Sequence, residues 1–332
     1  THTEQADKRH STTHKYQVYD TLSLSIEPSD IVFNKLLNSL DNPKPKRNLH
    51  TGINETTGHL ANMRVWFCDT FPQKLKITGS LAKFHYGDNL QKLTRSETEQ
   101  AIQKLSETLT VDMKQAKVQR LDIGANFVLS KPCAEYQACL GEIPRMKRST
   151  LTSAQGEGVY FQNSKRTLAI YNKVKDCQKL RQPIPEVFQG RHVLRYELRY
   201  MKNISAQLKL QTVTAQDLYS EIFYIDILNR WRDCYFSINK NEGYRMRDDI
   251  DIEKPKDLIN YFAAIGIQQL GGTGKVLELL KVSQQSGKLT KQRAYSLRNK
   301  VHEITTIPKL VEPNNSIKEL DSKVEKATAY YR

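Results

Sequence analysis

The chain has 332 residues, of which 38% are hydrophobic and 26% charged, a balance typical of a soluble globular protein with one large domain or two of ordinary size. It has no long apolar run and no signal-peptide pattern, so we expect neither membrane insertion nor secretion, and a cytoplasmic location. The five cysteines form no CxxC pair, which favours buried thiols over a structural zinc site or a disulfide framework.

The net charge of +15 is unevenly distributed. Between Pro144 and Lys202 there are 13 Lys and Arg residues against 4 Asp and Glu, so +9 of the charge lies in this segment. Such a field favours a polyanion, because each neutralised phosphate releases condensed counterions. Nucleic acid is therefore the first partner to consider, and a solvated basic face is the alternative.

The N-terminal third predicts strands and helices after a flexible arm at residues 1–15. Residues 16–28 alternate like a strand, and Ser29 or Asp30 could cap a helix that follows directly. The Pro and Asn residues of "DNPKPKRN", 41–48, indicate a loop.

Further strands are expected at 61–69 and 73–81, where β-branched and aromatic residues alternate with polar ones. A helix over 96–111 begins with an apparent capping box, Ser96 to Glu99. The largely apolar stretch 118–129 is a further strand.

Residues 158–163 and 165–173 indicate a hairpin, and the alternating segment 190–203 indicates another strand. The fold class is therefore α+β, with a largely antiparallel sheet covered by helices and followed by a helix-rich C-terminal region. We expect a core over 16–205 and a helical region over 206–332, whose segments around "SGKL" resemble a DNA-reading helix-turn-helix or any short helical hairpin.

Polar residues inside apolar strands are candidates for chemistry, because an unpaired buried carboxylate is costly. Asp122, Tyr171 and Glu197 are such residues, and they would meet if their strands are neighbours. Two carboxylates suit Mg²⁺ or Mn²⁺, beside which a tyrosine could attack a phosphodiester. Lys173 and Arg195 could activate that tyrosine. The alternative is that the acids pair with Arg120, Arg195 or Arg199 and that the tyrosine belongs to the core.

Two other segments carry polar groups. Lys83, His85, Asp88 and Asn89 crowd an expected strand-to-turn segment where Gly87 permits a sharp bend, and His85 is either a metal ligand or a structural histidine. The segment "GGTGKV", 271–276, lacks the P-loop spacing and follows a helix-like segment, so we expect no nucleotide site.

The segments "GSLAKFHYGDNL", "RLDIGANF", "RTLAIYNK" and "LRYELRY", in this order, resemble the phage and plasmid replication initiators of the gene II/gene X family, over roughly residues 18 to 240. The resemblance implies a rolling-circle initiator that nicks one strand of an origin through a phosphotyrosine intermediate and later rejoins it. It implies Tyr171 as nucleophile and Asp122 and Glu197 as metal ligands or general bases. The filamentous-phage members have His in place of Asp88, which leaves open which of His85, Asp88 and Asn89 contacts the metal.

The expected cofactor is Mg²⁺ or Mn²⁺, and the expected partners are origin DNA, single-stranded or supercoiled, with host helicase and polymerase. Alternatives are a relaxase or transposase-like strand-transferase and a non-catalytic DNA-binding regulator. Whether a second tyrosine, such as Tyr160, Tyr196 or Tyr200, takes part is left open. The expected DNA-contacting residues are Lys83, Asn89, Arg120, Lys147, Arg148, Lys165, Arg166, Arg199, Lys291, Arg293 and Arg298.

Overall fold

A computed structural model of the chain describes residues 19–27, 33–70, 72–87, 93–153, 156–240, 245–247, 252–270, 272–312 and 316–329. The predicted arm at 1–15, the predicted caps Ser29 and Asp30, and the candidate residues Asp88 and Asn89 lie outside this part. None of the described helices is long and apolar enough to cross a membrane.

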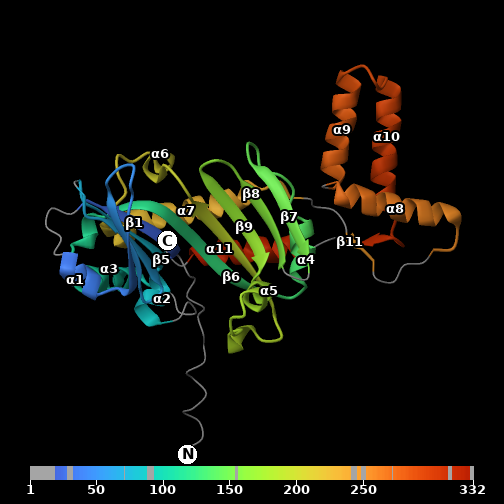
Figure 1. Cartoon of the computed structure of the whole chain (residues 1–332). Coiled ribbons are helices and arrows are strands. Elements are labelled where there is room, and N and C mark those ends of the chain that lie inside the picture. The colour runs from blue at the N-terminus through green and yellow to red at the C-terminus, as the bar shows by residue number, and fades with distance from the viewer. Residues whose placement is uncertain are drawn as a thin grey trace, which may run out of the picture. The chain divides into compact units, whose positions relative to one another are not determined.

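The strands confirm a largely antiparallel sheet within an α+β fold (Figure 1). Ten strands follow the order β2-β3-β4-β5-β1-β6-β10-β9-β8-β7, and every neighbouring pair whose register is resolved is antiparallel. Their bounds are β1 Tyr19–Ile26, β2 Asp41–Arg47, β3 Asn54–Leu60, β4 Met63–Cys68, β5 Lys74–Ser80, β6 Lys117–Leu129, β7 Lys147–Ser153, β8 Gly156–Gln162, β9 Arg166–Asn172 and β10 His192–Tyr200; β11 Arg245–Met246 pairs separately with β12 Val311–Glu312.

The helices become more frequent toward the C-terminus, as predicted. Those before residue 210 are α1 Phe33–Asn38, α2 Leu81–Tyr86, α3 Arg95–Leu109, α4 Cys133–Ala138, α5 Lys173–Lys179 and α6 Ile204–Leu208. Those after it are α7 Glu221–Phe236, α8 Pro255–Gln269, α9 Thr273–Gln285, α10 Lys291–Ile304 and α11 Ser316–Ala329. The chain forms two compact units, Thr1–Asn126 with Glu197–Leu228 and Phe127–Tyr196 with Asn229–Arg332. The predicted division at residue 205 stays a prediction.

In the first unit, the apolar side of α3 is buried through Ala101, Ile102, Leu105 and Leu109. The predicted helix is confirmed, but its cap is not the predicted one. Thr94 is the N-cap, and its hydroxyl accepts from the Glu97 N–H while the Glu97 carboxylate accepts from the Thr94 N–H. The Thr94–Glu97 capping box has the same spacing as the predicted Ser96–Glu99 box but lies two residues earlier. The helix therefore begins at Arg95, before Ser96.

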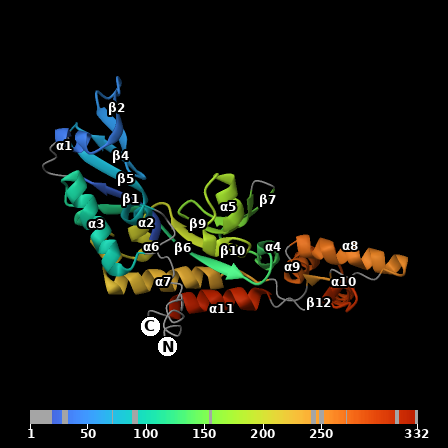
Figure 2. The ribbon, with the colours of Figure 1, turned by 90° about the horizontal axis from the view of Figure 1, so that it is seen from below.

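The predicted loop at 41–48 is wrong, because Asp41–Arg47 forms the edge strand β2 (Figure 2). Proline is tolerated at a sheet edge, where its missing N–H does not interrupt a ladder on both sides. The strand-to-turn prediction for Lys83 and His85 is also wrong, since both lie on the short helix α2. Gly87 ends this helix with φ 89°, in the left-handed region that glycine adopts without strain.

In the second unit, the predicted hairpin is confirmed as β8 and β9, closed by Asn163, whose side chain accepts from the Lys165 and Arg166 N–H groups. Helices α8, α9 and α10 enclose a small core of Ala264, Ile267, Val301, Ile304, Leu310 and Val311. Helices α9 and α10 run side by side as a helical hairpin (Figure 1).

Candidate active site

A buried ion pair on β6 holds the first candidate acid. The Asp122 side chain is 3% exposed, and Arg120 binds it through Nε to Oδ1 at 3.0 Å and Nη2 to Oδ2 at 2.6 Å. Residues two apart on a strand share a face, which is why the sequence R-L-D forms this bidentate pair. The Arg120 side chain is 31% exposed, so the arginine contacts solvent whereas the acid is buried.

The neighbouring strand β10 repeats the arrangement in the sequence E-L-R. The Glu197 side chain is 4% exposed, and its Oε2 accepts from Arg199 Nη2 at 2.5 Å and from Arg199 Nε at 2.7 Å. Because β6 and β10 are adjacent in the sheet, the two carboxylates interact electrostatically. Burial raises the pKa of Asp122, and Glu197 adds to this rise, while Arg120 and Arg199 oppose it.

The two acids therefore lie on adjacent strands and interact electrostatically, and each pairs with an arginine, as the alternative required. That both acids meet Tyr171 in one place stays a prediction. Among the described residues, no group of three or more His, Cys, Asp or Glu side chains is placed to hold a metal ion together. The oxygen donors of the two acids have the right chemistry for a hard divalent cation. The two guanidinium groups now supply the positive charge that such a cation would bring.

Tyr171 lies in the second unit, near the end of β9, with 9% of its surface exposed. It lies opposite Gly158 of β8. A Cβ added to Gly158 would come within 2.9 Å of the Tyr171 Cβ, so only glycine leaves room for the tyrosine in this place. Sequence reasoning missed Gly158, although a glycine inside a strand pattern signals such a close approach.

The predicted activators of Tyr171 have the following surroundings. Lys173 is the first residue of α5, and its ammonium group pairs with Asp176 Oδ2 at 2.8 Å. Arg195 is buried on β10, with 3% of its surface exposed. Of the other tyrosines, Tyr196 is in the core and donates its hydroxyl to the Trp231 carbonyl at 2.8 Å. Whether it, Tyr160 or Tyr200 takes part in the reaction stays open.

The charged residues that act on His85, Lys104 and Glu97, both lie on α3. Burial lowers the pKa of His85, the nearby Lys104 lowers it further, and Glu97 opposes the shift. Its Nδ1 is buried without a hydrogen-bond partner among the described residues. Lys83, two residues earlier on the same short helix, is exposed.

The predicted DNA-contacting cations divide into two groups. Lys147, Lys165, Lys291 and Arg293 are exposed, as is Lys83. The others are held by protein groups. Arg120 and Arg199 are ion-paired, and Arg148 Nε donates to the Leu140 carbonyl at 3.1 Å. Arg166 Nη1 lies 3.6 Å from Cys234 Sγ, and Arg298 Nη2 donates to Gln284 Oε1 at 2.7 Å. DNA contact by each of them stays a prediction.

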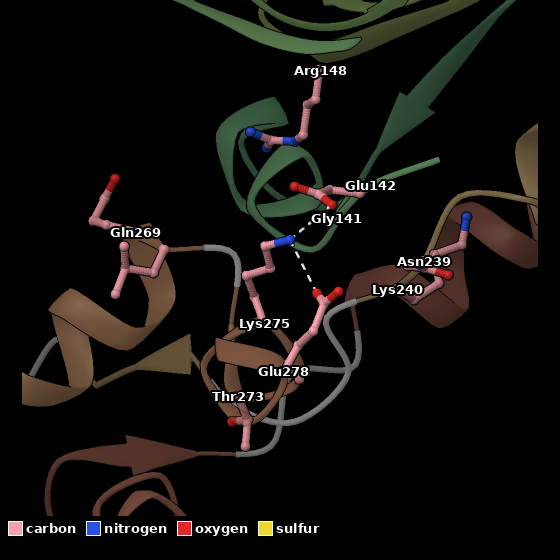
Figure 3. Close-up of a pocket in the computed structure, with 11 residues that line it drawn as sticks. Gly141, Glu142, Arg148, Asn239, Lys240, Gln269, Thr273, Lys275 and Glu278 are labelled. Carbon is pink, nitrogen blue, oxygen red and sulfur yellow. Dashed lines mark hydrogen bonds and ion pairs between the residues drawn. The ribbon is translucent and has the colours of Figure 1, made fainter. Parts of the chain in front are cut away.

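A cavity of about 560 Å³ lies in the second unit around Arg148 and the first turn of α9 (Figure 3). In it, the Lys275 ammonium bonds to Glu278 Oε2 at 3.0 Å and to Glu142 Oε2 at 3.2 Å. Thr273 of this segment thus begins a helix that follows another helix along the chain, and Lys275 is engaged by two carboxylates. A phosphate loop would instead follow a strand and keep its lysine for the phosphates.

The sequence profile of a family of replication-associated proteins, described as the N-terminal part of the gene II-type protein, matches residues 30–219. The chain belongs to this family. The match spans Asp122, Tyr171 and Glu197 together with the strands that carry them, and it confirms the predicted resemblance to gene II-type replication initiators. Membership in this family supports a general role in the initiation of replication.

No curated protein sequence matches the chain. Among solved structures, the crystal structure of the di-domain ARO/CYC StfQ from the steffimycin biosynthetic pathway aligns with the chain at 9% identity, covering 64% of this chain and 96% of that one. The TM-score of 0.17 is too low for this likeness to bear on fold or function.

Proposed function

We propose that the protein is a rolling-circle replication initiator that nicks one strand of its origin through a covalent phosphotyrosine intermediate and later rejoins that strand. The observation that supports this most directly is the family match across residues 30–219, which includes the tyrosine and both buried acids. The net charge of +15 supports DNA as the substrate.

The Tyr171 hydroxyl is the proposed nucleophile. Its oxygen attacks a backbone phosphorus, the bond from phosphorus to the 3′ oxygen breaks, and that oxygen leaves as a hydroxyl with the proton that the phenol lost. The 3′-hydroxyl then serves as a primer for a host polymerase while a host helicase unwinds the duplex. In the reverse step a 3′-hydroxyl attacks the phosphotyrosine, so rejoining needs no nucleotide.

Asp122 and Glu197 are the residues that would hold Mg²⁺ or Mn²⁺, since both offer buried carboxylate oxygens on adjacent strands. When bound, such an ion polarises the phosphodiester and stabilises charge that develops on its oxygens. His85 and Asp88 remain proposed as further ligands. Lys173 and Arg195 are proposed to stabilise the tyrosinate and the phosphate by their positive charge.

The test is to incubate the protein with Mn²⁺ and supercoiled or single-stranded DNA of its own replicon, denature it, and identify the peptide bonded to DNA by mass. We expect the adduct on Tyr171, its loss in Tyr171→Phe, and its retention in the matched variant Tyr160→Phe from the neighbouring strand β8. Both variants should keep their affinity for DNA.

Each other outcome contradicts a definite part of the proposal. An adduct on another tyrosine keeps the chemistry and discards Tyr171 as nucleophile. Tight DNA binding with no adduct in the parent protein indicates a non-catalytic regulator. Nicking confined to a transfer origin or a transposon end, with none at a replication origin, indicates a relaxase or transposase-like enzyme.

A further inference from the structure

The edge strand β2 and the turn that follows it form a basic, exposed surface outside the candidate active site. All seven residues of β2 are exposed on both faces, and among the described strands it pairs with β3 alone. Residues 42–54 contain Lys44, Lys46 and Arg47 and no acidic residue. We call Asp41–Asn54 the basic edge.

The cations of the basic edge are not engaged by acids. Within the part of the chain that the structure describes, Lys44, Lys46 and Arg47 form no ion pair, whereas Arg120 and Arg199 of the same unit do. Lys46 faces Glu55 across the hairpin, but the Glu55 carboxylate accepts from Trp66 Nε1 at 3.3 Å. Three cations that pair with no acid among the described residues have positive charge available for a partner at this edge.

The turn is closed by its own hydrogen bonds and presents an apolar side chain at its tip. Asn48 closes it: its N–H donates to the Ile53 carbonyl at 2.8 Å, and its side chain accepts from the His50 and Thr51 N–H groups. Gly52 adopts φ 68°, which the tight turn requires. Leu49 is held at this tip with 89% of its surface exposed.

From this arrangement we infer that the basic edge grips duplex DNA, with Lys44, Lys46 and Arg47 on the phosphates and Leu49 inserted against a base step. Lys44 and Lys46 share a face of the strand and lie about 6.8 Å apart at the usual rise, a spacing suited to successive phosphate contacts. Apolar wedges such as leucine unstack base steps where a protein deforms a duplex.

Duplex DNA fits better than single-stranded DNA, because residues 41–54 contain no Phe, Tyr or Trp on which unpaired bases could stack. The inference rests on the proposed function, since an initiator that nicks a duplex origin must hold the duplex and disturb its stacking. It adds a contact surface that does not include Tyr171 or the acid pair.

The first experiment compares the parent protein with the full-chain variant K44Q/K46Q/R47Q. Fluorescence anisotropy measures its affinity for a fluorescein-labelled linear duplex of mixed sequence, and for the corresponding single strand, over a range of NaCl concentrations. We expect the slope of log K against log salt on the duplex to fall in magnitude by about 2.7, from three lost contacts of about 0.9 each. The control K117Q/K318Q/K326Q removes the same charge at exposed positions and should change the slope by less than one contact.

The second experiment replaces Leu49 by Ser and follows a duplex that contains 2-aminopurine, whose fluorescence rises when the base unstacks. The parent protein should raise this fluorescence, and Leu49→Ser should abolish the rise while it leaves the salt slope unchanged.

An unchanged salt slope in K44Q/K46Q/R47Q overturns the inference, and so does an equal loss of single-strand and duplex affinity. Aggregation of that variant with parental DNA affinity indicates that the lysines only protect the sheet edge from pairing. If the triple variant does not fold, as judged by circular dichroism, the single variant Arg47→Gln is measured instead. The inference then requires the slope of log K against log salt to fall in magnitude by about 0.9. Tyr171→Phe should keep the parental slope, so failure of the adduct test and failure of this inference are distinguishable.

Discussion

Removal of Arg120 should destabilise the protein more than removal of its partner's charge. In Arg120→Met, the Asp122 carboxylate keeps its buried position, with a side chain 3% exposed, but loses both guanidinium bonds. Breaking a buried ion pair from one side costs about 3–5 kcal/mol. Because Arg120 is itself 31% exposed, solvent screens part of the pair, and we expect the lower end, about 3 kcal/mol.

The variant Asp122→Asn retains the shape of the side chain and one acceptor for Arg120, so its expected cost is about 1–2 kcal/mol. The double variant R120M/D122N leaves neither a buried charge nor an unpaired guanidinium. It should therefore be about 2 kcal/mol more stable than the sum of the single changes predicts.

Urea unfolding followed by circular dichroism measures these free energies, and hydrogen exchange in peptides from β6 locates the change. Arg64→Met, an exposed arginine on β4, is the matched control and should stay within about 0.5 kcal/mol of the parent. Additive single and double effects, with a coupling below about 0.5 kcal/mol, would refute the reasoning that Arg120 compensates the buried charge.

Further predictions concern the second unit. Gly158→Ala should destabilise this unit by about 1–3 kcal/mol and lower the yield of the DNA adduct, because the new Cβ would meet the Tyr171 Cβ at 2.9 Å. Urea unfolding measures the first effect and the adduct yield measures the second. An unchanged yield would contradict the positioning role of this glycine. Glu319 of α11 accepts from Ser130 and Tyr136. Burial acts to raise the pKa of Glu319, but these bonds outweigh it and the pKa is lowered. Its stabilisation is therefore present above the unfolded pKa of about 4.3 and is lost as pH falls through the folded pKa. Glu319→Gln should cost about 1 kcal/mol at pH 7 and flatten the decline of the urea midpoint in acid, whereas the control Glu325→Gln should follow the parent curve.

The strands that carry the candidate site could be predicted because their patterns are local. The segment of β6 is largely apolar, and β10 places Arg195, Glu197 and Arg199 on one face by simple alternation. The edge strand β2 could not be predicted in this way, because its two prolines and its fully polar, exposed surface resemble a loop. Only its pairing with β3, a non-local contact, makes it a strand.

The pairing within the site shows where sequence reasoning ends. The spacing R-L-D and E-L-R places each arginine two residues from an acid on the same face, so a local ion pair was always an alternative to a metal site. The spacing does not predict that β6 and β10 are adjacent, because their residues are more than 60 positions apart and meet only in the folded sheet. That adjacency brings two buried carboxylates together, and each then needs a positive charge of its own. The arginines supply that charge from positions that are still about 30% exposed. The charge balance of the site thus joins two local ion pairs, which residue spacing can predict, through a non-local contact between strands, which it cannot.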